Sequence, residues 1–325
     1  MNEKTKKLLK NLSTLIIIVA VYFVIQFAIN SGLLKRHATS LIVPVFVNIL
    51  LAVSLNLTTG FLGELTLGHA GFMSVGAYIG ALITMHLGNM PWGLSFALAM
   101  IAGGLTAALF GVIIGMPVLR LRSDYLAIVT LAFGEIIKSL INAMKITGGA
   151  KGLSGIPTYA NYKHFLLVYA IVMACVVLIA NFVKSRHGRA ITSIRDNYIA
   201  AEAIGIPVAR YKVMAFSVSA FFAGIAGVLY AHNTSIIKPG NFDYNKSIEI
   251  LVIVVLGGMG SIKGSIIAAV VLTLLPEVLR GADNYRMLLY AIVLIAMMLF
   301  NNSKLKTSWV ARRNLKKAAA AEKEA

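Results

Sequence analysis

Four ionisable residues in apolar surroundings are best placed to do chemistry in this chain: Glu64, His69, Glu135 and Lys138. Ionisable side chains at membrane depth are rare and often mark a substrate path or a proton relay. They can also act only as hydrogen-bonding groups that hold helices together. For Glu64 both interpretations stay open. Glu135 and Lys138 are three residues apart, which predicts an intramembrane ion pair and favours the structural role, as does the glycine-rich setting of His69.

An enzymatic activity finds little support in the sequence. There is no HExxH, CxxC or GxSxG pattern, and the few carboxylates and histidines are scattered. The stretch from Gly257 to Gly264 faintly resembles a phosphate-binding loop, but Lys263 lacks the preceding glycine and following hydroxyl of a Walker A motif. The single cysteine, Cys175, excludes an intrachain disulfide. We therefore expect no catalysis, no metal and no bound cofactor.

A polar segment, residues 184–212, lies between two strongly apolar stretches. Apolar residues recur in it at the three-and-four spacing of one helical face: Ile191, Ile194, Tyr198 and Ala201. Most of the polar segment is therefore predicted to form one short amphipathic helix that ends at Gly205. Its apolar face lacks the bulky anchors of lipid-bound surface helices. This favours docking against another protein over a helix that lies at the lipid surface.

Composition places the rest of the chain in a membrane. Of 325 residues, 58% are hydrophobic and 13% are charged, and the mean hydropathy is +0.83; soluble domains have about 25% charged residues. The apolar runs do not alternate, which is typical of an all-α polytopic bundle. The net charge of +18 comes from basic residues at the ends of apolar runs. That distribution indicates membrane topology and not nucleic-acid binding.

About ten membrane segments are expected. They are 12–29, 41–57, 72–85, 92–118, 125–144, 165–183, 213–231, two shorter segments within 248–280, and 287–300. Together they form a transmembrane domain, 12–300, between an N-terminal segment, 1–11, and a basic tail, 301–325. Both ends and the polar segment are rich in Lys and Arg, which predicts that all three are cytoplasmic; Lys35 and Arg36 then fall outside, against the rule.

Glycines punctuate the predicted segments in two ways. Gly76 with Gly80 and Gly111 with Gly115 form GxxxG patterns, which favour close helix packing. The glycine turns at 63–71 and 257–264 indicate broken helices. Because breaks often occur at corresponding positions of two halves, they also suggest an inverted repeat.

Four stretches, in order, resemble ABC importer permeases of the branched-chain amino-acid (LivM) type. They are Asn56 to Phe72, Ser123 to Glu135, Gly188 to Ile206 and Gly257 to Gly264. The third is similar to the cytoplasmic coupling loop of that family, and the second favours the LivM type over its LivH-like partner. The likeness extends from about Leu41 to Phe300.

The resemblance implies the architecture of an ABC importer permease in a bacterial plasma membrane, surrounded by lipid. It implies three kinds of protein partner: a second, LivH-like permease, two cytoplasmic ATPases that bind the ATP, and an extracytoplasmic substrate-binding protein. No nucleic acid is expected as a partner. The residues it assigns to ATPase coupling are Arg195, Asp196, Glu202, Ala203 and Gly205. Those it assigns to the translocation path are Glu64, Gly68, His69, Gly257, Gly258 and Gly260. Few charges are expected along that path.

The substrate is the least determined part of this interpretation. The subfamily also resembles urea and short-amide permeases, so these substrates are the alternative to leucine, isoleucine and valine. The loop departs from the general importer pattern, since Glu202-Ala203-Ile204 runs directly into Gly205. An ion-coupled secondary transporter and a scaffold subunit are the rival classes. Broken helices and Glu64 support the secondary transporter, but it does not explain the long docking loop. A scaffold subunit would show no transport defect when Glu64 or Gly258 is changed.

Overall fold

The computed structural model describes residues 19–27, 31, 36–88, 90–119, 123–279, 285, 288, 291–295 and 299. The predictions for 1–11, for most of 287–300 and for 301–325 therefore lie outside the described residues; of the first predicted span, residues 19–27 are helical. The chain divides into two compact units, Met1–Thr273 and Leu274–Ala325. The features described below belong to the first unit, except that the last helix listed, α11, continues beyond Thr273 to Val278.

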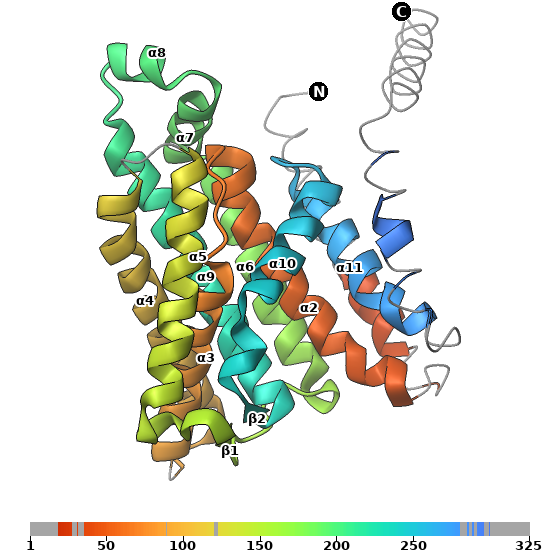
Figure 1. Ribbon diagram of the computed structural model, residues 1–325. Coiled ribbons are helices and arrows are strands. Elements are labelled where there is room, and N and C mark those ends of the chain that lie inside the picture. Colours follow the sequence, from red (N-terminus) through yellow and green to blue (C-terminus); the bar gives the residue numbers. More distant parts are fainter. Residues whose placement is uncertain are drawn as a thin grey trace, which may run out of the picture. The chain divides into compact units, whose positions relative to one another are not determined.

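The first unit is built almost entirely of helices, as predicted (Figure 1). They are α2 (Arg36–Asn56), α3 (His69–His86), α4 (Trp92–Val118), α5 (Ser123–Ala143), α6 (Phe165–Lys184), α7 (Arg186–Asp196), α8 (Tyr198–Ala203), α9 (Val208–Thr234), α10 (Tyr244–Gly257) and α11 (Ile262–Val278). Among the described residues, five helical stretches are long and apolar enough to cross a membrane: Thr39–Leu62, Trp92–Val118, Tyr125–Ala143, Phe165–Lys184 and Val208–Thr234. The total of ten segments stays a prediction.

Small residues bring α9 into close contact with α3 and α4. Gly76 of α3 lies directly against the backbone of Gly224 in α9, where any added side chain would overlap it. In α4, a Cβ on Gly111 would lie 2.9 Å from the Cβ of Ala220. Because lipid gives apolar side chains no reason to associate, such close backbone packing is a main source of helix association in membranes. The close packing predicted from the two GxxxG patterns is confirmed.

The first glycine-rich break is shorter than the sequence suggested. After α2 the chain continues as a π-helix, Leu57–Leu62, and only residues 63–68 before α3 are non-helical. The wider π turn is stabilised because the hydroxyls of Thr58 and Thr59 both donate to the Leu55 carbonyl, each at 2.9 Å. Gly63 then ends the π-helix with a φ of 82°, a left-handed conformation that favours glycine.

The second break agrees with the prediction of two segments joined at a glycine turn. Helix α10 ends at Gly257 and α11 begins at Ile262. Two regions predicted as loops instead form a short antiparallel pair, β1 (Leu153–Ser154) with β2 (Ile236–Ile237), in which Leu153 lies opposite Ile237. The pairing satisfies the hydrogen bonds of backbone groups in both segments. Strands of two residues are too short to be detected from sequence periodicity.

Candidate functional site

The polar segment folds as two short helices and not as the single helix predicted. Ser185 caps α7 by accepting a hydrogen bond from the Gly188 N–H, and Asn197 caps α8 by accepting one from Ala200 at 3.1 Å. Asn197 has extended backbone angles, φ −161° and ψ 101°, so it stops α7 and restarts the chain in a new direction. Asn is a preferred N-cap residue because its side-chain oxygen satisfies a free N–H of the first turn.

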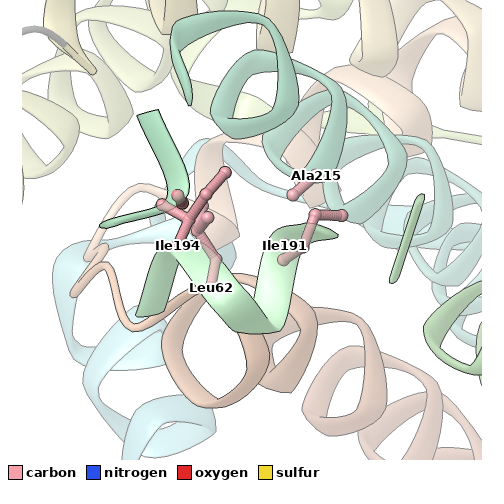
Figure 2. Close-up of a cluster of buried hydrophobic side chains, with 5 residues drawn as sticks. Leu62, Ile191, Ile194 and Ala215 are labelled. Atoms are coloured by element: carbon pink, nitrogen blue, oxygen red, sulfur yellow. The ribbon is translucent and has the colours of Figure 1, made fainter. Parts of the chain in front are cut away.

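Helix α7 buries its apolar face against its own chain. Ile191 and Ile194 pack with Leu62 from the π-helix and Ala215 from α9, in a cluster that also contains Ala201 (Figure 2). Figure 2 shows Leu62 beside Ile194, and Ile191 beside Ala215. The predicted face was therefore correct for three of its four members, but Tyr198 is 58% exposed. The expectation that this face needs another protein to cover it was wrong.

Arg195 connects α7 to the first glycine-rich break. Its Nη1 donates to the Gly60 carbonyl at 3.0 Å, while its Nε and Nη2 donate to Asp196 Oδ1 at 3.0 and 2.8 Å. The aliphatic part of Arg195 lies over Gly63, where an added Cβ would stand 2.7 Å from Arg195 Cγ. A planar, five-donor guanidinium suits this double contact better than an ammonium would.

The turn between α10 and α11 meets the end of α2 and the π-helix at the same place. Asn56 Oδ1 accepts a hydrogen bond from the Gly260 N–H at 2.8 Å, and Asn56 Nδ2 donates to Ser265 Oγ at 2.9 Å. Gly60 lies so close to Gly260 that an added Cβ would overlap its backbone nitrogen. The turn between α10 and α11, the π-helix and α7 are thus joined through backbone groups. No pattern around Asn56 predicts this bridge.

Glu64 belongs to this region and not to the interior of the bundle. It forms an ion pair with Lys212, near the beginning of α9, and the two side chains are only 12% and 17% exposed. The second carboxylate oxygen, Oε2, is buried and has no hydrogen-bond partner among the described residues. Lys212 lies in the polar segment, so Glu64 lies at the same end of the bundle as α7. Its part in a translocation path stays a prediction.

Gly68 and His69 lie in a separate set of buried polar contacts. His69 is 1% exposed and its Nε2 lies 2.9 Å from Ser54 Oγ. Gly68 is in close contact with the backbone of Thr130 in α5, and the Ala70 N–H donates to Ser247 Oγ of α10 at 3.1 Å. These contacts tie α2, α3, α5 and α10 together. They provide His69 with the satisfied hydrogen bond that the sequence favoured.

Glu135 and Lys138 are brought together on α5. Lys138 Nζ lies 3.1 Å from Glu135 Oε2, and Glu135 Oε1 also accepts from the Tyr244 N–H at 3.3 Å. The carboxylate therefore neutralises the lysine and holds the beginning of α10. Both side chains are about one-third exposed, 36% for Glu135 and 30% for Lys138.

The remaining predicted coupling residues are on the surface. Asp196, Glu202, Ala203 and Gly205 are all exposed, and so are two large apolar neighbours that the sequence analysis passed over, Ile199 and Ile204. These isoleucines are 64% and 76% exposed. Ile204 falls outside the helical spacing of Ile191 and Ile194, and this difference in register was the signal that could have revealed a second apolar face.

The helices and their contacts define an all-α polytopic membrane protein whose polar segment is attached to two broken helices. The chain belongs to the family described as branched-chain amino acid transport system / permease component, whose profile matches residues 37–300. This membership confirms the resemblance stated from the four sequence stretches.

Individual relatives agree with the family assignment. The chain is 34% identical to the high-affinity branched-chain amino acid transport system permease protein LivM of Escherichia coli, over 90% of this chain and 75% of that protein. It is 35% identical to the Salmonella typhimurium LivM, over 82% and 69%. It is 22% identical to the Salmonella typhimurium permease protein LivH, over 69% and 78%. No solved structure matches the chain.

Proposed function

We infer that this chain is a membrane-spanning permease subunit of an ATP-driven importer of branched-chain amino acids. The observation that carries the inference is the 34% identity to LivM over 90% of the chain. The chain is a transport subunit and not an enzyme, because its relatives are permeases. It is a multi-pass membrane protein, and the bacterial plasma membrane is its proposed location.

The proposed partners follow from the same family. They are a second permease of the LivH type, two cytoplasmic ATPases and an extracytoplasmic binding protein that delivers substrate. Both chain termini are proposed to be cytoplasmic. The ATPases would face α8, whose exposed apolar side chains Tyr198, Ile199 and Ile204 surround Glu202 in sequence. An amphipathic helix laid into a groove is a common mode of recognition, and these residues supply its apolar anchors.

Movement of the ATPases would reach the membrane through α7. Ile191 and Ile194 attach α7 to Leu62 and α9, so α7 cannot rotate without moving the π-helix. Arg195 adds a directed hydrogen bond to Gly60, which contacts Gly260. Energetic coupling between distant sites travels through such contiguous packed and hydrogen-bonded groups. The predicted path glycine Gly260 is therefore two contacts away from Arg195 of α7, through Gly60.

Purification of the chain with its bound partners tests the assembly. The wild-type chain, extracted in mild detergent, should retain two nucleotide-binding polypeptides and a second permease. Glu202→Arg should weaken retention of the ATPases by about a hundredfold while the second permease stays bound. Lys151→Glu, a charge reversal at an exposed residue outside the polar segment, is the matched control. ATPases retained equally by both variants would contradict the coupling assignment.

Transport in liposomes tests the substrate and the energy source. The reconstituted complex with its binding protein should accumulate leucine, isoleucine or valine only when ATP is present. Uptake of urea or short amides in their place would transfer the assignment to the alternative substrate class. Uptake that needs an ion gradient and no nucleotide would instead identify a secondary transporter.

A further inference from the structure

Lys246 makes contacts that the coupling region does not explain. It lies in the first turn of α10, where the helix dipole disfavours a cation. Its Nζ lies 3.1 Å from Glu249 Oε2 and donates to Asn48 Oδ1 at 3.2 Å. Asn48 in turn donates to Thr273 Oγ1 of α11 at 2.9 Å. We call Lys246, Glu249 and Asn48 the α10 charge cluster.

The α10 charge cluster contacts the middle part of a candidate membrane span. Asn48 is the tenth of the 24 residues in the span Thr39–Leu62. At the other side of the α10 start, Glu135 accepts a hydrogen bond from Tyr244 and is the eleventh of the 19 residues in the span Tyr125–Ala143. The beginning of α10 therefore contacts the middle of two candidate spans, which indicates a position at mid-depth. At this depth an ionisable residue is a functional candidate by default.

The exposed face of α10 carries polar residues at this depth, beside Tyr244 and Ile248, which are 47% and 40% exposed. The Glu249 side chain is 43% exposed, and Asn245 is exposed with its amide donating to Asp243 at 2.8 Å. A carboxylate and an amide are not stable against lipid tails, so this face must meet water or another protein chain. In contrast, Ile136 on α5, next to Glu135, is 64% exposed and can face lipid without cost.

The backbone around the α10 charge cluster is that of a broken membrane helix. Helix α10 has 14 residues, so at about 1.5 Å per residue it is about 21 Å long, less than the roughly 30 Å of a bilayer core. It follows the strand β2 and a short 3₁₀ helix, η5 (Pro239–Phe242). In transporters, half-length helices that begin at the midplane commonly border the substrate site.

We propose that the α10 charge cluster is a mid-membrane binding site for the two charged ends of the substrate. Lys246 binds the carboxylate and Glu249 binds the ammonium group. This proposal rests on the proposed function, since it assumes a free amino acid as cargo. A zwitterion can replace one ion pair by two without leaving any charge unpaired, which keeps the desolvation cost low. The proposal differs from the sequence-based expectation that the path exposes few charges.

Charge exchange separates a substrate contact from a structural ion pair. In the reconstituted complex, Lys246→Met and Glu249→Gln should each lower ATP-dependent leucine uptake by about ten- to a hundredfold, while ATPases and binding protein still associate. The double variant K246E/E249K keeps an ion pair but reverses both charges. It should stay as inactive as the single variants. Lys263→Met, at an exposed lysine on α11, should transport normally. Recovery of uptake in the double variant would overturn the proposal.

Cysteine accessibility tests the location of the α10 charge cluster without a transport assay. In a background that carries Cys175→Ala, Glu249→Cys should react with a charged, water-soluble thiol reagent at least about tenfold faster than Ile136→Cys at similar depth. Leucine should slow the reaction at position 249 only. Equal, slow reaction at both positions would overturn the proposal.

The two experiments also separate this proposal from the proposed function. If the wild-type complex moved urea or an amide and no amino acid, the importer assignment would need a new substrate. The α10 charge cluster would then not be a zwitterion-binding site, even if Glu249→Cys reacts quickly. If leucine is transported and position 249 does not react, the proposed function stands and only the proposed binding site is contradicted.

Discussion

The two helices of the polar segment, adjacent in sequence, bury very different fractions of their apolar side chains. In α7, Ile191 and Ile194 are 0% and 4% exposed, whereas in and just after α8, Ile199 and Ile204 are 64% and 76% exposed. The first helix is thus part of the permease core. The second has apolar side chains that no described residue covers, as expected of a surface completed by a partner. Asn197 lies at the boundary between the buried helix α7 and the exposed helix α8.

The largest expected difference between the helices comes from placing a charge on each apolar face. Ile191→Asp buries a carboxylate without a partner and should destabilise the permease by about 3–5 kcal/mol. Ile199→Asp replaces an exposed side chain and should change stability by less than about 0.5 kcal/mol. Thermal unfolding of the purified variants measures both. Equal losses would erase the distinction between α7 and α8.

The variant with the smaller effect on stability, Ile199→Asp, should have the direct effect on ATPase binding. Ile199→Asp should fold normally yet retain little of the two ATPases, because a charge replaces an apolar anchor of the docking helix. Quantitative co-purification measures this retention. Normal ATPase binding by Ile199→Asp would place the docking surface elsewhere.

Arg195 belongs to α7, the helix whose apolar face is buried in the permease, so its variants test the role of that helix. Arg195→Ala removes the charged hydrogen bond to the Gly60 carbonyl and should cost about 1.5–3 kcal/mol. Uptake should fall while ATPases remain bound and hydrolyse ATP, so the two activities become uncoupled. Arg195→Lys should restore uptake only in part, because an ammonium cannot bond Gly60 and Asp196 in one plane. Parallel loss of ATPase binding would argue for a docking role instead.

Substitutions of Gly205 test whether the backbone conformation just after α8 matters for ATPase binding. Its φ of 87° is left-handed, and no atom lies within 4 Å of an added Cβ, so Gly205→Ala meets conformational strain without a clash. The expected cost is about 1–2 kcal/mol. Gly205→Asn should cost less because Asn tolerates this conformation. ATPase affinity, measured by titration, should follow that order; identical affinities would show that the exit geometry is not used.

Asn197 should give the smallest effect. Asn197→Ala removes the cap of α8 and should cost about 1 kcal/mol, whereas Asn197→Asp keeps an accepting oxygen and should be nearly neutral. Amide hydrogen exchange of α8 measures the fraying directly. The α7 amides should be unaffected in both variants, and a change there would mean that the helices behave as one unit.

The sequence predicted the fold class, the glycine turn after Gly257, and the apolar face formed by Ile191 and Ile194. These features depend on local composition and spacing, which a single sequence displays. It could not predict that Asn56 would bridge to Gly260, or that Glu64 would pair with Lys212, because those partners are 204 and 148 residues away. The break at Asn197 was missed because a helical period can continue across a cap residue.

The uncovered side chains of α8 also affect the permease before it is assembled. On the proposed topology, a newly made copy presents Tyr198, Ile199 and Ile204 to the cytoplasm until the ATPases bind. Exposed apolar residues of this kind are what chaperones and proteases use to identify orphan subunits. α8 should therefore help to set subunit stoichiometry, since permease made in excess of its ATPases would be degraded while assembled copies persist.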